Sequence, residues 1–417
     1  MNRMVIETSV RQAGNDPIFR IAEAAKNRIA TVGKDNVINS TLGALMDDNG
    51  NLVTFDSVYS VFRNLKDSEI ASYAGIPGTP TFLNNVIDAC FKSHRPKGYI
   101  RSIATPGGTG AIRHAIANYT EIGDKVLISD WHWEPYETIA DENHRSVTTF
   151  KLFNENGNFN MNSYKSKMLE LLNVQKRVLS IINSPAHNPT GYCLSDDEWR
   201  EIVLFYTKTA KAHPEWRIIL ECDIAYIDFT GKNDESRRFM ELLSDMPENV
   251  LVLYAYSASK AYTMYGLRNG AIICVAPNEE IADEFVSTCS YSNRGTWSNG
   301  THGAMSTLAK ITDDKKLKKT FENEQRKYKI ILQQRAAAFV NAAKEINLQI
   351  CHYVDGFFIT IPCQKPKMVS EELMKMNFFI VELKNGLRFA PCAVSEEQCK
   401  KAPALIKKAM DSIEINA

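Results

Sequence analysis

The most informative stretch of the chain reads Tyr256-Ser257-Ala258-Ser259-Lys260, and Gly266-Leu267-Arg268-Asn269-Gly270 follows it closely. An apolar run that predicts a buried strand precedes the stretch. A lysine amine becomes nucleophilic when burial or neighbouring cations lower its pKa, and it then forms an imine with an aldehyde. The hydroxyl of Ser257 and the planar guanidinium of Arg268 suit phosphate oxygens. Alone, the stretch fits two interpretations equally, a lysine that binds a phosphorylated aldehyde and an ordinary surface lysine between strands.

A glycine-rich turn lies upstream and reads Thr105-Pro106-Gly107-Gly108-Thr109-Gly110-Ala111. It follows an apolar run and precedes the helical pattern of Ile112–Tyr119. Glycines at this place let backbone N–H groups approach an anion, and the start of the helix adds positive partial charge. Such a turn by itself is more often a structural loop than a phosphate site.

An acidic residue follows one of the predicted strands. Asp223 lies in Glu221-Cys222-Asp223-Ile224-Ala225-Tyr226, after the predicted strand Arg217–Glu221. A carboxylate beside a pyridine ring keeps the ring nitrogen protonated, which makes the ring an electron sink for a carbanion. The plain alternative is an aspartate that caps a helix or lies in a loop.

A further polar segment reads Ala186-His187-Asn188-Pro189-Thr190-Gly191. Its asparagine can donate a hydrogen bond to the phenolate oxygen of such a ring, with Tyr226 as a second donor. A simple turn is the alternative, because Asn-Pro often opens turns. Trp133, or with less reason Trp131, follows a predicted strand and is placed to stack on the ring face, although a packing tryptophan is an equally good interpretation.

Short apolar runs alternate with amphipathic helical stretches in the middle of the chain. We predict strands at Val126–Ser129, Val147–Leu152, Val178–Ile182, Arg217–Glu221, Val250–Tyr254 and Ala271–Val275. Helices are predicted at Ser163–Leu172 and Asp196–Lys211, and the second opens with the capping box Ser195-Asp196-Asp197-Glu198. This alternation predicts an α/β domain with a mostly parallel central sheet.

The last part of the chain has a different pattern. It contains a long charged helix at about Asp313–Ile346, strand candidates at Gly356–Ile361, Phe378–Leu383 and Gly386–Ala390, and a final helix at about Glu396–Ile413. These elements predict a smaller α+β domain. We therefore expect an N-terminal arm that contributes to the small domain (residues 1–52), a large domain (53–328) and a small C-terminal domain (329–417).

The composition is that of a neutral globular protein. The chain has 417 residues, 44% apolar and 24% charged, which is large for a single core. Its net charge of 0 favours neither nucleic acid nor an anionic membrane. The nine cysteines lack metal-ligand spacing and predict free thiols, and the N-terminus has no secretory run. Free thiols without a signal peptide lead us to expect a cytoplasmic protein, and the cysteine spacing leads us to expect no metal. No apolar stretch approaches the ~20 residues of a membrane span.

The motifs, taken in order, resemble one known family. G-G-T-G-A, H-N-P-T-G, D-x-A-Y and S-x-S-K-(x)7-R are similar to the motifs of class I aminotransferases of the pyridoxal-5′-phosphate (PLP) fold type I. The aspartate/aromatic amino acid aminotransferase branch is the most similar. Four further segments also look like that branch, so the resemblance covers nearly the whole chain: Asp16–Phe19, Asn39–Gly43, Asp47–Gly50 and Asn385–Arg388.

The resemblance implies a fold type I homodimer and a role for each matching residue. Lys260 would hold PLP as a Schiff base and shuttle the proton, and Asp223 would pair with the pyridinium nitrogen. The other implied cofactor contacts are Asn188 and Tyr226 at the phenolate oxygen, Gly108, Thr109, Ser257 and Arg268 at the phosphate, Trp133 on the ring, and Tyr73 from the partner subunit. Arg388 would bind the substrate α-carboxylate, with Gly43 and Asn188 beside it. The resemblance also implies a cis peptide bond at Asn188–Pro189.

Two departures from the family's pattern concern specificity. Thr288 stands where we place the arginine that binds a distal carboxylate in aspartate-specific members, and the nearest arginine is Arg294. The segment Asp130-Trp131-His132-Trp133 also lacks the usual proline before the tryptophan. We expect Arg294 to bind dicarboxylates in an enzyme that accepts aromatic donors too.

The predicted function is transfer of an amino group from an amino acid, aspartate or aromatic, to a 2-oxo acid such as 2-oxoglutarate. The nearest alternative is another PLP reaction on the same scaffold, either β-elimination or decarboxylation. A PLP-binding regulator is a more distant alternative, because such proteins carry a fused DNA-binding domain and the family signature begins almost at the start of this chain.

Overall fold

The computed structural model describes residues 4–10, 17–231 and 234–415 of the chain. Two compact units are distinguished by their internal contacts. The larger unit comprises Leu52–Gln334 and Cys351–Phe358, and the smaller one comprises Met1–Asn51, Arg335–Ile350 and Ile359–Ala417. The segment Asp16–Phe19 begins outside the described residues.

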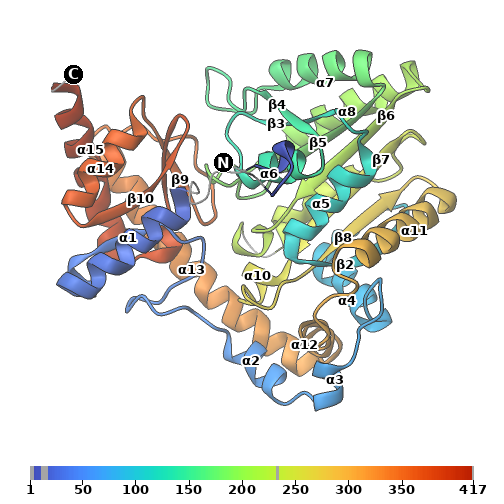
Figure 1. Cartoon of the computed structure of the whole chain (residues 1–417), viewed down its shortest axis with the longest axis horizontal. Coiled ribbons are helices and arrows are strands. Elements are labelled where there is room, and N and C mark those ends of the chain that lie inside the picture. The colour runs from blue at the N-terminus through green and yellow to red at the C-terminus, as the bar shows by residue number, and fades with distance from the viewer. Residues whose placement is uncertain (1–3, 11–16, 232–233, 416–417) are drawn as a thin grey trace. The chain divides into compact units, whose positions relative to one another are not determined.

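A seven-stranded sheet forms the centre of the larger unit (Figure 1), in the order β2-β8-β7-β6-β5-β3-β4. Its strands are β2 (Tyr99–Pro106), β3 (Lys125–Ser129), β4 (Ser146–Phe150), β5 (Arg177–Asn183), β6 (Arg217–Asp223), β7 (Val250–Ser257) and β8 (Asn269–Ala276). Strands β3 to β7 pair in parallel, whereas β8 runs antiparallel to its neighbours β2 and β7. The predicted mostly parallel sheet of an α/β fold is therefore confirmed.

These strands have continuous apolar sequences because both faces of the sheet are buried. Every residue of β7 and β8 is buried. Side chains on one face, including Leu253 and Ile272, pack with Ala115 and Ile116 of the helix α5 (Gly107–Tyr119). Strands that are covered on both sides lack the alternation of polar and apolar residues seen in half-exposed sheets.

The larger unit contains further helices. They are α2 (Asp56–Arg63), α3 (Asp67–Ala71), α4 (Pro80–Phe91), α6 (Pro135–Glu142), α7 (Met161–Gln175), α8 (Asp196–Ala212), α9 (Arg238–Leu242), α10 (Ala258–Ala261), α11 (Glu279–Thr296) and α12 (His302–Asp313). Helix α8 begins at the predicted capping box, where Ser195 Oγ accepts from the Glu198 amide at 3.2 Å. Within the described part of the chain, no helix is long and apolar enough to cross a membrane.

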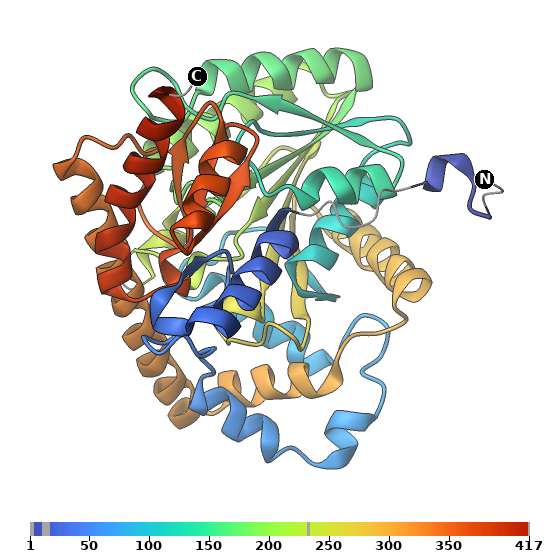
Figure 2. The ribbon, with the colours of Figure 1, turned by 60° about the vertical axis from the view of Figure 1, so that its left-hand side comes forward.

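The smaller unit joins segments from distant parts of the sequence in one four-stranded sheet, of order β1-β10-β11-β9. Its strands are β1 (Ile38–Ser40), β9 (Ile359–Pro362), β10 (Phe378–Leu383) and β11 (Gly386–Phe389), and its helices are α1 (Pro17–Val32), α14 (Pro366–Lys375) and α15 (Glu396–Ile415). Strand β1 pairs in parallel with β10, and Figure 2 shows the blue N-terminal ribbon beside the red C-terminal one. Ile21 and Ala25 of α1 pack against Phe379.

Several predicted elements differ from the structure at their ends. The long helix predicted at Asp313–Ile346 is α13 (Lys315–Glu345), separated from α12 by Asp314, whose carboxylate accepts from the amides of Lys316 and Leu317. The strand predicted at Gly356–Ile361 begins only at Ile359. The reason is Gly356, whose φ of 106° belongs to the left-handed region and interrupts an extended strand. The strand predicted to end at Glu221 continues to Asp223.

Candidate active site

The predicted cofactor residues gather around one pocket of the larger unit. Its lining consists of Gly108, Thr109, Ile112, Trp133, Asn188, Asp223, Ala225, Tyr226, Ser257, Ser259, Lys260 and Arg268. Most of these residues lie at the carboxyl ends of strands, since Asp223 ends β6, Ser257 ends β7 and Asn188 follows β5. Ligands of parallel α/β sheets bind at this edge, because the loops there converge.

One corner of the pocket is built from groups that suit a phosphate. Helix α5 begins at Gly107, so the free N–H groups of its first turn point into the pocket region. Arg268 donates to Ser259 Oγ at 3.3 Å and to the Tyr265 carbonyl at 2.9 Å. Gly107 has a φ of 66°, and a Cβ there would lie 2.9 Å from Arg268 Nη2. The close approach of helix and guanidinium therefore requires glycine at this position.

Asp223 is buried and held by two hydrogen bonds. Its Oδ2 accepts from the Tyr136 hydroxyl at 2.5 Å, and its Oδ1 accepts from the Ala225 amide at 3.1 Å. Burial raises the pKa of Asp223, while both hydrogen bonds and the charge of Lys260 act in the opposite direction. Tyr136 is a residue that the sequence analysis missed, because its partner lies far away in the chain and no motif marks it.

Lys260 lies on α10, directly after β7, and faces an aromatic wall. Its Nζ is 5.2 Å from the centre of the Tyr226 ring. The Tyr226 ring in turn packs against Phe357 and Phe358, with ring centres 5.2 and 5.6 Å away. The segment Cys351–Phe358 thus belongs to the larger unit because it closes this wall.

Asn188 lies in a turn that contains a cis peptide bond. Asn188–Pro189 is a cis peptide bond, as predicted, and Ser184–Pro185 is a second cis bond that was not predicted. The Asn188 amide donates to Asn183 Oδ1 at 2.6 Å. Of the two tryptophans considered, Trp133 lines the pocket, and its ring meets Tyr136 edge to face at 5.4 Å.

Four predicted residues do not line this pocket. Tyr73 is 88% exposed, and Arg294 is an exposed residue of α11 whose guanidinium donates to Ser298 Oγ at 2.6 Å. Arg388 and Gly43 belong to the smaller unit. There, Arg388 is buried on β11 and donates to the Thr41 carbonyl at 3.2 Å, so it lies close to the segment that contains Gly43.

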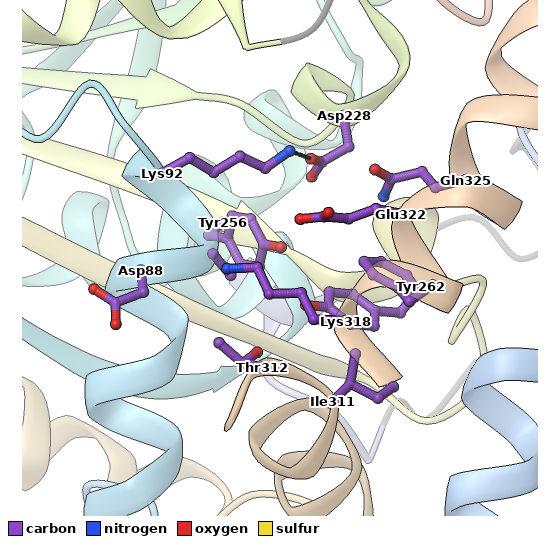
Figure 3. A pocket seen from close by; sticks show the side chains of 12 residues that line it. Asp88, Lys92, Asp228, Tyr256, Tyr262, Ile311, Thr312, Lys318, Glu322 and Gln325 are labelled. Carbon is purple, nitrogen blue, oxygen red and sulfur yellow. Dashed lines mark ion pairs between the residues drawn. The ribbon is translucent and has the colours of Figure 1, made fainter. Parts of the chain in front are cut away.

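A separate cavity lies on the other face of the sheet, since Tyr256 lines it and Ser257 lines the first pocket (Figure 3). Lys92 Nζ is 3.6 Å from Asp228 Oδ1 there, and Asp228 also accepts from Arg237 at 2.7 Å. Burial raises the pKa of Asp228, but the charges of Arg237 and Lys92 outweigh it and hold that pKa below its usual range. No predicted site residue lines this cavity.

Comparison with known proteins adds independent evidence. The chain is 25% identical to the aromatic-amino-acid aminotransferase of Paracoccus denitrificans, over 63% of this chain and 64% of that protein. It is 24% identical to the aspartate aminotransferase of Haemophilus influenzae, over 81% of this chain and 83% of that protein.

Solved structures agree in fold. A crystal structure of an aminotransferase from Anaerococcus prevotii matches with a TM-score of 0.96 at 39% identity, covering 98% of this chain and 100% of that one. The aromatic-amino-acid aminotransferase of Burkholderia pseudomallei, covalently bound to pyridoxal phosphate, has a TM-score of 0.76 at 21% identity, over 98% and 100%. The family model for aminotransferase class I and II matches residues 35–406, and the chain belongs to this family of PLP-dependent aminotransferases.

Proposed function

We propose that PLP binds in the pocket around Lys260 and that the protein transfers amino groups from aspartate or aromatic amino acids to 2-oxo acids such as 2-oxoglutarate. One observation carries the proposal. Nine of the ten residues predicted to contact the cofactor line a single pocket, although the sequence spreads them from Gly108 to Arg268. The relatives with aspartate and aromatic-amino-acid names support the substrate classes.

The residues of the pocket fit PLP chemically. The bound cofactor supplies an electron sink for the carbanion of the substrate. Lys260 Nζ attaches the cofactor and moves the substrate's α-proton, while the Asp223 carboxylate holds a proton on the ring nitrogen. Asn188 and Tyr226 donate to the phenolate oxygen, and Trp133 covers the ring face. The N–H groups of Gly108 and Thr109, the Ser257 hydroxyl and the Arg268 guanidinium bind the phosphate.

Substrate recognition is assigned to arginines. Arg388 binds the α-carboxylate in a bidentate manner, and Gly43 and Asn188 lie beside the substrate. Arg294 binds the distal carboxylate of aspartate and 2-oxoglutarate, because Thr288 offers no charge. Leaving a carboxylate unpaired in a closed site is energetically costly, so a cationic side chain has to pair with the distal carboxylate of the substrate.

The assembly we propose is a cytoplasmic homodimer. Tyr73 is 88% exposed in the single chain, so its ring is accessible to a partner subunit. In the homodimer, Tyr73 reaches the phosphate bound by the partner subunit.

The deciding experiment is a donor panel with 2-oxoglutarate as acceptor and aspartate, tyrosine, phenylalanine and a branched-chain amino acid as donors. We expect glutamate to form in a 1:1 ratio with the 2-oxo acid of the donor, without ammonia or carbon dioxide. Ammonia as the main product would instead indicate β-elimination, and carbon dioxide would indicate decarboxylation. PLP binding without turnover of any donor would favour a regulator.

A further inference from the structure

A second carboxyl group is buried two residues before Asp223 on the same strand. Glu221 lies within β6, is fully buried, and neither of its carboxyl oxygens has a hydrogen-bond partner in the described part of the chain. A buried carboxylate without partners is strongly disfavoured, and such a group stays protonated instead. The predicted strand ends at this residue, so its burial was not predicted.

The surroundings of Glu221 are apolar. Alternate residues of a strand point to the same face, so Glu221 shares its face with Ile219 and Asp223. In the sheet register it lies opposite Ile181 of β5 and Leu253 of β7. Ile219, Ile181 and Leu253 all belong to the core that α5 covers.

Within the described ranges, four ionisable groups interact electrostatically with Glu221. They are Asp223 and Cys222 on its own strand, Tyr136 from α6 and Cys289 from α11. Burial raises the pKa of Tyr136, Cys222 and Cys289, so all three are neutral at physiological pH. Burial first, and the charge of Asp223 second, raise the pKa of Glu221 well above its usual range.

The carboxyl groups of Asp223 and Glu221 differ in the hydrogen-bond donors around them. Asp223 receives hydrogen bonds from the Tyr136 hydroxyl and the Ala225 amide, and Lys260 stabilises its charge. Among the residues that the structure describes, none donates a hydrogen bond to the Glu221 carboxyl. When two acids share one buried face, the negative charge goes to the acid with donors, and the other keeps its proton.

We propose that Glu221 is a neutral carboxylic acid at physiological pH and that Tyr136 is a positioning residue, which together keep the negative charge of this face on Asp223. The role of Tyr136 rests on the proposed function, in which Asp223 meets the cofactor's ring nitrogen. The protonation of Glu221 does not depend on it, because it follows from the protein's own packing.

The first test uses the protein without PLP. A carboxyl whose folded pKa exceeds its unfolded value costs stability increasingly as pH rises from the unfolded pKa toward the folded one. Glutamine does not titrate. The melting temperature of Glu221→Gln, relative to wild type, should therefore increase as the pH rises above about 5. Exposed Glu280→Gln is the control, and its difference from wild type should stay small throughout.

Infrared spectroscopy tests the protonation state of Glu221 independently. At neutral pH the wild type should show the C=O band of a protonated carboxyl, and Glu221→Gln should lack that band. A melting-temperature difference that is flat or falls with pH, or an unchanged infrared band, would overturn the protonation of Glu221.

The second test concerns Tyr136. Tyr136→Phe keeps the ring and removes the donor to Asp223, and a hydrogen bond to a charged group corresponds to about 10- to 100-fold in a binding constant. We expect PLP affinity to fall by that factor, and the low-pH loss of affinity to begin at a higher pH. Unchanged affinity with an unchanged pH profile would overturn the positioning role.

Asp223→Asn separates this inference from the proposed function. If that variant keeps full PLP affinity, Asp223 is not the ring partner and the role of Tyr136 fails with it. The measurements on Glu221 in the PLP-free protein would stand in that case.

Discussion

Lys260 concentrates the proposed chemistry in one side chain. Lys260→Ala removes the only amine that lines the pocket among the described residues, so turnover should fall by several orders of magnitude and the visible absorption of covalently bound PLP should disappear. Borohydride reduction of the wild type with peptide mapping should place the label on Lys260. Lys318→Ala, in the cavity of Figure 3, is the control and should keep both properties. A label on another lysine contradicts the assignment.

We propose that the single residue Arg294 determines whether dicarboxylates are accepted. Arg294→Ala should raise the KM for aspartate and 2-oxoglutarate by about 10- to 100-fold, because one charge-assisted hydrogen-bond pair is lost. The KM for phenylalanine should hardly change, since its side chain carries no charge. Arg294→Lys keeps the charge and should recover part of the loss. Equal effects on both kinds of donor would mean that Arg294 does not bind the distal carboxylate.

Helix α5 illustrates what an element contributes to binding. Gly107→Ala introduces a Cβ at a φ of 66°, 2.9 Å from Arg268 Nη2, so it strains the backbone and displaces the guanidinium. We expect a loss of about 1–3 kcal/mol in stability and weaker PLP binding, measured by thermal unfolding and by titration with PLP.

A matched glycine separates these two effects. Gly123 has a φ of 90° and no atom within 4 Å of an added Cβ. Gly123→Ala should therefore lower stability through backbone strain alone and leave PLP affinity unchanged. If both variants bind PLP like the wild type, the start of α5 does not hold the phosphate.

Elements could be predicted where local pattern determines them. Strands β3 to β8 and helix α8 follow from apolar runs and a capping box, and they appear within a few residues of their predicted ends, whereas no bounds were predicted for β2. The predicted long helix starts at Asp313, whereas α13 begins at Lys315 because Asp314 caps it. The predicted strand ends at Glu221, whereas β6 continues to Asp223.

The residues of the site likewise divide into those that a local motif marks and those that only the fold brings together. Lys260, Asp223, Asn188 and Arg268 stand in short motifs, so sequence alone could group them. Tyr136 and Glu221 could not be found in this way, because their importance comes from which side chains the sheet brings near them. A hydrogen bond between Tyr136 and Asp223 is a property of the fold and leaves no local signature.

At the scale of the whole molecule, we predict that activity requires the homodimer. Sedimentation should show a dimer at working concentrations, and activity should fall on dilution as it dissociates. Tyr73→Phe should weaken PLP retention about 10-fold through the loss of one hydrogen bond to phosphate, with unchanged unfolding temperature. A monomer of full activity would refute the assembly.

The pairing of β1 with β10 has a consequence during synthesis. Ile38 leaves the ribosome long before Phe378, its partner in the sheet. At about 5–20 residues per second, roughly 20–70 s separate them. For that time the apolar side of α1, with Ile21 and Ala25, has no sheet to cover it. The nascent N-terminal segment is therefore a natural client for a chaperone, whereas the large sheet is complete well before translation ends.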